Sequence, residues 1–393
     1  MRPVDLPEPS TPAREASERL RALIVDRIVR AGGWLGFDAY MGAALYEPGL
    51  GYYSGGAHKF GADGDFVTAP EISPLFGECL AQQCLEWFEQ APARIVEFGA
   101  GSGVLAAQLL GELDRLGVEG LEYWIVELSG ELRERQRGSI GTLAPALAAR
   151  VRWLDRWPDS IAGVVIGNEL LDAMPARMFR LDRGRVLERG VGLDDDRLVF
   201  ADRDADAGFR DEVRALLAQA WGEERGWPDA YVSEVGAQAS AWVREAGLRL
   251  ERGALLLLDY GFPRAEFYHP QRSGGTLMCH YRHFSHGDPF RLPGLQDVTV
   301  HVDFSAVAQA AQAAGLDGLG YTSQASLLLN LGLLDRLARV PADEVARYVP
   351  QAQAVKRLLS EAEMGELVKA VAFGRGLDDD ALGFRRGDRR AAL

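Results

Sequence analysis

The run from Arg94 to Gly103, R-I-V-E-F-G-A-G-S-G, holds the densest pattern of residues that could do chemistry. Glycine has no Cβ, so backbone N–H groups and the start of a following helix can approach a ligand closely. A dinucleotide-binding loop would have a third glycine where Val104 stands. An acid before G-x-G-x-G instead suits S-adenosylmethionine, because a carboxylate favours its ammonium and sulfonium; a tight turn without a ligand is the alternative. The residues expected at the methionine end are Glu97, Gly99, Ala100, Gly101 and Gly103.

Two further acids follow at the ends of the next expected strands. The strand L-E-Y-W-I-V-E ends in Glu127, one β-α-β step after the glycines, where a carboxylate can accept hydrogen bonds from both ribose hydroxyls. We assign Glu127 and Leu128 to this part of the ligand, an ordinary solvated glutamate being the alternative. The strand V-R-W-L-D ends in Asp155, which we place on the adenine side.

A third group of polar residues follows an apolar strand expected from Gly163 to Gly167. In an open parallel sheet, ligands bind at the carboxyl ends of the strands. Asn168, Glu169 and Asp172 come directly after this end, so we predict that they form the reaction centre, with Asn168 also near the cofactor. Polar residues that only cap a helix are the alternative, since Asn and Asp favour such turns.

The elements that must position these residues are read from periodicity and turn signals. We expect a helix from Thr11, a helix from Pro74 to about Phe88, and an insertion of hairpins and helices over 176–250. The stretch between the first helix and the helix from Pro74 is rich in glycine, proline and aromatic residues and shows little periodicity. Such a composition is typical of a binding loop rather than a structural one. We expect this loop to close over the cofactor with Asp65, Thr68, Pro70 and Glu71.

Composition limits the classes of function. The 393 residues have 47% hydrophobic and 25% charged content and a net charge of -14, with a pI near 5.0. That charge argues against binding along a phosphate backbone, so no nucleic-acid partner is expected. No apolar run approaches the length of a membrane span. Cys279, His280, His283 and His286 match no usual metal spacing and the three cysteines form no C-x-x-C, so no metal is expected.

The motifs together resemble the MidA-like methyltransferases, a family that includes a mitochondrial complex I assembly arginine methyltransferase. The matching pieces are L-Y-E-P-G-L-G-Y-Y, G-D-F-V-T-A-P-E-I-S-P-L-F-G-E, V-E-F-G-A-G-S-G, N-E-L-L-D-A-M-P, L-L-D-Y-G and D-V-T-V-H-V-D-F, in order between residues 40 and 335. The resemblance implies S-adenosylmethionine as cofactor. The mitochondrial member of the family is described as methylating an arginine of a complex I subunit, and on that model we expect a protein substrate with arginine as the methylated residue; the resemblance itself does not give this chain's substrate. The N-terminus lacks a transit-peptide pattern, so we expect a bacterial, cytoplasmic member.

The resemblance also implies a fold and a division of the chain. It implies an α/β fold of the class I methyltransferase (Rossmann-like) type, with a mostly parallel seven-stranded sheet. We expect an N-terminal helix and cofactor-covering loop over 1–75, and a methyltransferase core over 76–330 with the insertion 176–250 between strands four and five. A C-terminal helical extension is expected over 331–393. The oligomeric state stays open, a homodimer being one option.

At one position this chain departs from the motif of symmetric arginine methyltransferases. N-E-L-L-D-A is similar to the S-E-L-L motif of symmetric arginine methyltransferases, which have a second glutamate nine residues on, where this chain has Met178. A clamp of two acids must therefore use another group, such as Asp172. The competing hypotheses are a small-molecule methyltransferase and a non-catalytic assembly factor that binds S-adenosylmethionine structurally.

Overall fold

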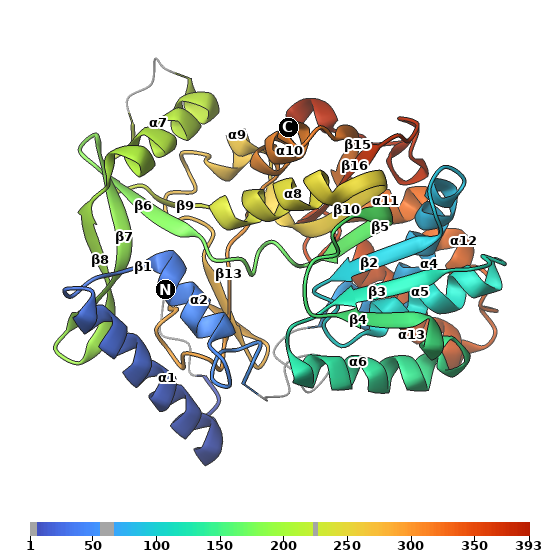
Figure 1. The fold of residues 1–393 in the computed structure, drawn as a ribbon, viewed down its shortest axis with the longest axis horizontal. Helices are drawn as coiled ribbons and strands as arrows, with labels where there is room; N and C mark the ends of the chain where they lie inside the picture. The colour runs from blue at the N-terminus through green and yellow to red at the C-terminus, as the bar shows by residue number, and fades with distance from the viewer. Residues whose placement is uncertain (1–5, 56–66, 223–226) are drawn as a thin grey trace. The chain divides into compact units, whose positions relative to one another are not determined.

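The computed structural model describes residues 6–55, 67–222 and 227–393. Its contacts divide the chain into two compact units, each made of several segments (Figure 1). The first unit comprises residues 1–66, 172–241 and 262–303. The second comprises residues 67–171, 242–261 and 304–393, and it contains the glycine-rich run.

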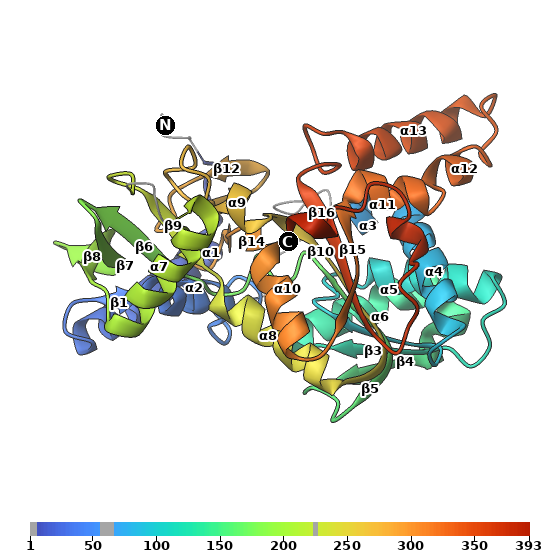
Figure 2. The same ribbon diagram turned by 90° about the horizontal axis from the view of Figure 1, so that it is seen from above.

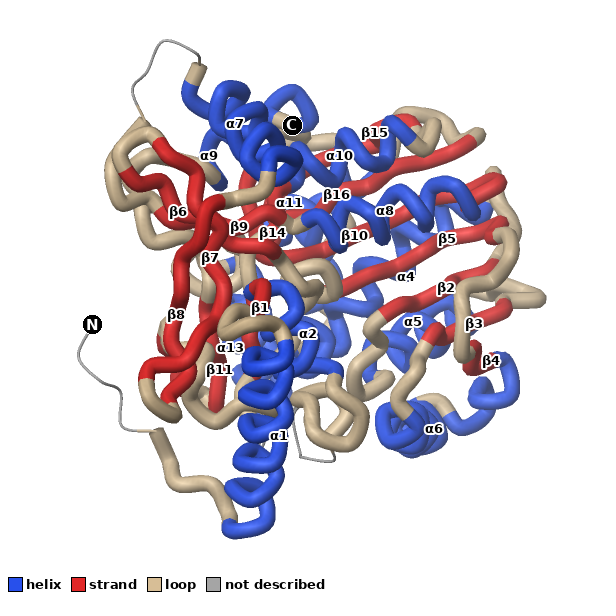
Figure 3. Tube along the Cα trace, turned by 60° about the vertical axis from the view of Figure 1, so that its left-hand side comes forward, coloured by secondary structure: helices blue, strands red, loops and turns tan. Residues whose placement is uncertain are grey.

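The second unit is built on a sheet with the strand order β15-β16-β10-β5-β2-β3-β4, as Figure 3 shows. The neighbours from β10 to β4 are parallel, and β16 is antiparallel to both β10 and β15. Along this path the described residues form seven strands that are mostly parallel, which confirms the predicted fold class. The strands are β2 (Arg94–Phe98), β3 (Glu122–Val126), β4 (Val151–Leu154), β5 (Ile161–Asn168), β10 (Leu250–Phe262), β15 (Asp317–Ser323) and β16 (Val368–Arg375).

Helices cover both faces of this sheet. Figures 2 and 3 show α8 and α10 on one face and α4 and α5 on the other. The central strands are buried on both faces, which is why β5 and β10 are almost continuously apolar in sequence. The helices are α3 (Ala69–Ile72), α4 (Pro74–Phe88), α5 (Val104–Arg115), α6 (Gly130–Leu143), α8 (Ala237–Arg249), α10 (Phe304–Ala313), α11 (Gln324–Asn330), α12 (Leu333–Leu337) and α13 (Val345–Leu359).

The first unit has an antiparallel sheet of its own. Its strand order is β1-β7-β6-β9, and β8 also pairs antiparallel with β7. The strands of this sheet are β1 (Leu35–Gly36), β6 (Arg177–Asp182), β7 (Arg185–Asp194), β8 (Arg197–Asp204) and β9 (Val232–Val235). The shorter strands β12 (Phe284–His286), β11 (Met278–Tyr281) and β13 (Asp297–Thr299) form a separate sheet in that order, and β14 (Val302–Asp303) follows along the chain. The helices are α1 (Thr11–Arg30), α2 (Phe37–Tyr46), α7 (Ala207–Trp221) and α9 (Arg264–Phe267).

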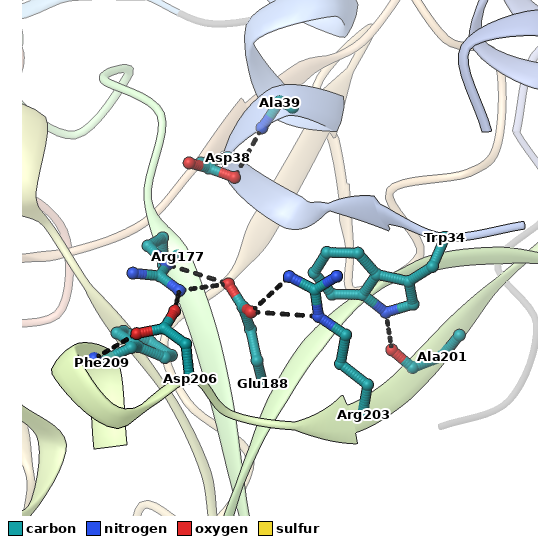
Figure 4. Close-up of polar contacts among 9 residues, drawn as sticks. All are labelled: Trp34, Asp38, Ala39, Arg177, Glu188, Ala201, Arg203, Asp206 and Phe209. Carbon is teal, nitrogen blue, oxygen red and sulfur yellow. Dashed lines mark hydrogen bonds and ion pairs between the residues drawn. The ribbon is translucent and has the colours of Figure 1, made fainter. Parts of the chain in front are cut away.

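An ion-pair cluster around the buried Glu188 joins the N-terminal segment to the hairpins within this first unit (Figure 4). Glu188 is 4% exposed and accepts hydrogen bonds from Arg177 and Arg203 at 2.6–3.3 Å. The Arg203 guanidinium lies 3.4 Å from the ring centroid of Trp34, whose indole N–H donates to the Ala201 carbonyl. The buried charge of the cluster, Glu188, is therefore paired with two guanidinium groups, as a buried charge requires, and Arg203 also stacks on the Trp34 ring.

Two expectations about the elements are corrected. The stretch predicted to be a loop contains helix α2, because Phe37, Tyr40, Met41 and Ala44 recur at helical spacing and are all buried. The C-terminal part predicted to be helical contains strand β16, whose run V-K-A-V-A-F-G-R is almost entirely buried between β15 and β10. The expected hairpins and helices of the insertion are present as β6 to β8, α7 and α8. None of the described helices combines the length and apolar character needed to cross a bilayer.

Candidate functional site

The glycine loop connects β2 to α5 and needs glycine at each of its three positions. Gly99, Gly101 and Gly103 have φ values of 66°, 50° and 80°, a left-handed region that side chains disfavour. Space is also short, because a Cβ on Gly103 would lie 2.9 Å from the Gln136 Cα. Gly103 is the N-cap of α5 and supplies no side-chain cap. The first N–H groups of this helix are therefore available to a polar ligand or water.

Glu97 lies one residue before the end of β2 and is 2% exposed. Its Oε2 accepts a hydrogen bond of 2.7 Å from the Tyr123 hydroxyl. Burial raises the pKa of Glu97 to about 7, and the Tyr123 hydrogen bond opposes that rise. Glu97 therefore changes charge near neutral pH, and a cation placed beside it would favour its ionised form.

Glu127 follows β3 and is held by a network that the sequence reasoning missed. Its Oε1 accepts from the Ser129 N–H at 2.9 Å, and its Oε2 accepts from Gln136 Nε2 at 3.1 Å. Gln136 is fully buried; it also donates to the Gly101 carbonyl at 3.3 Å and accepts from Trp153 Nε1 at 2.9 Å. Gln136 thus connects the glycine loop with the acid of the next strand.

The remaining predicted residues on this side lie at strand ends. Leu128 follows Glu127 and is 78% exposed. Asp155 follows β4 and is exposed. Both therefore sit after carboxyl ends of parallel strands, where ligands of such sheets bind.

The segment around α3 is attached to the glycine loop. Glu71 Oε1 accepts a hydrogen bond of 3.0 Å from the hydroxyl of Ser102, which lies between two loop glycines. Gln108 of α5 donates to the Pro70 carbonyl at 2.7 Å. Thr68 is the N-cap residue of α3. Asp65, predicted for the same loop, lies outside the described residues.

Asn168 and Glu169 come together at the carboxyl end of β5. Asn168 Nδ2 donates to Glu169 Oε1 at 3.3 Å, and the Glu169 N–H donates to the Leu258 carbonyl at 2.8 Å. Burial, and then the charge of Asp259, raise the pKa of Glu169 to about 8. Within the described residues, the buried atoms Asn168 Oδ1 and Glu71 Oε2 have no hydrogen-bond partner. Such acceptors suit a ligand that carries several N–H donors.

Asp172 falls in the other unit of the chain. It is 7% exposed, and its carbonyl accepts from the Val300 N–H at 3.0 Å. Pairing of Glu169 with Asp172 as a clamp stays a prediction.

His280, one of the histidines considered for metal binding, lies 3.1 Å from the Ser285 hydroxyl. The described residues contain no group of three His, Cys, Asp or Glu side chains that could hold a metal.

Comparison with known proteins identifies the family to which this chain belongs. Residues 79–322, more than half of the chain, match a protein-family model described as "Putative S-adenosyl-L-methionine-dependent methyltransferase". The chain belongs to this methyltransferase family. It is similar to the structure of a Burkholderia thailandensis protein bound to S-adenosyl-homocysteine, with 50% identity, a TM-score of 0.94, and coverage of 99% of this chain and 100% of that one.

Curated relatives of the methyltransferase are more distant. Protein arginine methyltransferase NDUFAF7, mitochondrial, from Danio rerio is 29% identical over 78% of this chain and 75% of its own length. The Drosophila melanogaster homologue is 27% identical over 95% of this chain and 89% of its own. The Homo sapiens protein is 26% identical over 86% and 79%.

S-adenosylmethionine is the cofactor of this methyltransferase. The chain's own residues fit such a group. The glycine loop leaves backbone N–H groups without side chains in front of them, and the residues after β3 and β4 include carboxylates and an exposed leucine. Glu97, with a pKa near 7, can take up a negative charge at the pH where the cofactor is a cation.

Proposed function

We propose that this methyltransferase transfers a methyl group from S-adenosylmethionine to an arginine side chain of a partner protein. The observation that carries the proposal is Glu169, a half-buried carboxyl group at the carboxyl end of β5 with a pKa near 8. The unpartnered buried oxygens of Asn168 and Glu71 support it, because a guanidinium offers five N–H donors in a fixed plane. The printed names of the mitochondrial relatives, which are protein arginine methyltransferases, support the same acceptor.

We assign the cofactor contacts to the predicted residues. Glu97 and the loop Gly99 to Gly103 would hold the methionine end, and Glu127 with Leu128 would hold the ribose and its surroundings. Asp155 would lie on the adenine side, and the segment from Thr68 to Glu71 would cover the cofactor. When bound, S-adenosylmethionine supplies the methyl group and leaves as S-adenosylhomocysteine.

Glu169 would orient the acceptor and take its proton. A guanidinium is always protonated in water, so one nitrogen must lose a proton as its bond to the methyl carbon forms. The Glu169 carboxylate can accept two N–H groups of one guanidinium and then receive that proton. A bound cation lowers the pKa of a neighbouring carboxyl group, so arginine binding near pH 7 would release a proton from Glu169 to solvent.

Glu169→Gln tests this role with one atom changed. We expect the variant to bind S-adenosylhomocysteine with a Kd within about twofold of the parent and to lose about 100-fold or more in methyl transfer, the range that general bases supply. Glu122→Gln is the control, because Glu122 is an exposed carboxylate paired with Arg94 on the far end of β3. Parent-like transfer by Glu169→Gln would remove Glu169 from the chemistry.

The partner protein is identified by finding which protein carries the labelled methyl group. A subunit of respiratory complex I is the first partner to test, because the family includes a mitochondrial complex I assembly methyltransferase. Incubation of the methyltransferase with labelled S-adenosylmethionine and a lysate should place label in protein, recoverable as methylarginine after hydrolysis. Label only in the small-molecule fraction would favour a small-molecule substrate. Cofactor binding without any transfer would favour a non-catalytic assembly factor.

A further inference from the structure

Asp259, near the end of β10, is a buried carboxylate that binds the backbone next to Glu169. It is 1% exposed. Its Oδ2 accepts hydrogen bonds from the N–H groups of Leu170 at 3.0 Å and Leu171 at 2.7 Å. Its Oδ1 accepts from the N–H of Tyr260 at 2.8 Å. One carboxylate therefore holds the turn that directly follows Glu169.

This turn needs holding because its first residue is strained. Glu169 has a φ of 51°, and the left-handed conformation costs a residue with a Cβ about 1–2 kcal/mol. The Glu169 N–H bonds to the Leu258 carbonyl on the same strand β10. Strand β10 thus binds three consecutive N–H groups, two of them through Asp259. If those bonds were lost, the turn could relax toward the right-handed region and carry the Glu169 side chain away.

The other side of the turn is fixed by packing against glycines. A Cβ on Gly99 would lie 3.0 Å from Leu170 Cδ1, and a Cβ on Gly167 would lie 2.9 Å from Leu170 Cδ2. The Leu170 side chain therefore fills the space that these glycines leave, against the first residue of the glycine loop. Hydrogen bonds to Asp259 on one side and this packing on the other set where Glu169 stands relative to the loop.

We propose that Asp259 is a positioning residue, which holds the turn 169–171 so that Glu169 is presented to the methyl acceptor. The inference rests on the proposed function of Glu169. Asp259 also affects Glu169 electrostatically, since its negative charge is the second cause, after burial, of the raised pKa. The other groups that act on Glu169 are the Asn168 amide, the Ala69 backbone and the Glu71 carboxylate.

Asp259→Asn tests the inference without changing size. The amide keeps one acceptor oxygen, loses the charge, and replaces the second oxygen by a group that cannot accept a hydrogen bond. In ¹³C NMR of the full chain with labelled glutamate carboxyl groups, the Glu169 signal is identified by its absence in Glu169→Gln. We expect its midpoint, near pH 8 in the parent, to fall by about one pH unit in Asp259→Asn. The control Asp317→Asn, at an exposed position at the start of β15, should leave the midpoint unchanged.

Activity is measured on the same proteins. Methyl transfer to arginine should fall about 10- to 100-fold in Asp259→Asn, while the Kd for S-adenosylhomocysteine stays within about twofold, because misplacing one catalytic group affects the reaction and not the cofactor. An unchanged Glu169 midpoint together with parent-like transfer would overturn the inference. Parent-like transfer by Glu169→Gln would instead overturn the proposed function, which keeps the two failures distinct.

A second variant covers the case in which Asp259→Asn does not fold. Asp259→Glu retains the charge and moves the carboxylate by one methylene. We expect it to keep the Glu169 midpoint near pH 8 but to lose about 10-fold or more in transfer, because the hydrogen bonds to Leu170 and Leu171 no longer meet their acceptor. Parent-like transfer by Asp259→Glu would show that the position of this carboxylate is not needed.

Discussion

Replacement of Glu97 by glutamine should change the pH dependence of stability in a calculable way. The pKa of Glu97 is raised from 4.5 to about 7, a difference worth about 3 kcal/mol at roughly 1.4 kcal/mol per pH unit. Below pH 4.5 the carboxyl group is protonated in the folded and unfolded chain alike. Between pH 4.5 and 7 the unfolded chain loses this proton first, so the free energy of unfolding falls, and above pH 7 the loss is complete.

Glutamine at this position has no proton to lose and can still accept the hydrogen bond from Tyr123. The free energy of unfolding of Glu97→Gln minus that of the parent should therefore be about 2.5 kcal/mol larger at pH 8 than at pH 5, because a small part of the loss has already occurred at pH 5. Urea unfolding of the cofactor-free protein, followed by tryptophan fluorescence, measures this difference. Glu122→Gln, which removes an exposed carboxylate from the neighbouring strand β3, serves as the matched control. A difference between Glu97→Gln and the parent that stays constant from pH 5 to 8 would refute the reasoning.

Three further outcomes are expected. The kcat/KM for arginine methylation should rise with pH up to about 8 and then level, because ionised Glu169 is required, and this dependence should vanish in Glu169→Gln. Gly103→Ala should weaken cofactor binding about 10-fold or more by calorimetry, since φ is 80° and Gln136 leaves no room, whereas Gly111→Ala within α5, with open space around it, should bind normally. Gln136→Leu should weaken the binding about 10-fold, because Glu127 Oε2 loses the hydrogen bond from Gln136 and keeps only the one from the Ser129 N–H to Oε1.

A different result would contradict each of these three predictions. A flat pH profile with parent-like rates would mean that Glu169 carries no proton in the reaction. Normal cofactor binding by Gly103→Ala would show that the loop can shift to accept a side chain. Parent-like affinity in Gln136→Leu would mean that Glu127 does not need its network to bind the ribose.

The parallel strands could be predicted individually because each carries its own local signal. The apolar runs that became β2 and β5 end in Glu97-Phe98 and in Asn168, so their polar ends meet at one edge of a parallel sheet. The apolar run of β16 also lies in the sequence, but a buried strand and a buried helix segment look alike over eight residues. Helix α2 was missed because glycines and prolines on either side obscured its helical spacing.

The residues that hold the site residues in place were harder to predict from the sequence. Gln136 sits between Leu132 and Ile140 at helical spacing, so a polar residue on the buried face of α6 was the available signal. What it binds, the Gly101 carbonyl and the Glu127 carboxylate, depends on how α6 packs on the loop. The hydrogen bonds from Leu170 and Leu171 to Asp259 join residues 88 and 89 positions apart, and no local pattern encodes such pairing.

The central claim is tested most directly by the chemical identity of the methylated product. The parent and Glu169→Gln are each incubated with methyl-labelled S-adenosylmethionine and a lysate, and the labelled protein is hydrolysed to amino acids. Methylarginine from the parent, with about 100-fold less or none from Glu169→Gln, is the result that the proposed function predicts. Label in another amino acid, label confined to small molecules, or equal methylarginine from both proteins would contradict it.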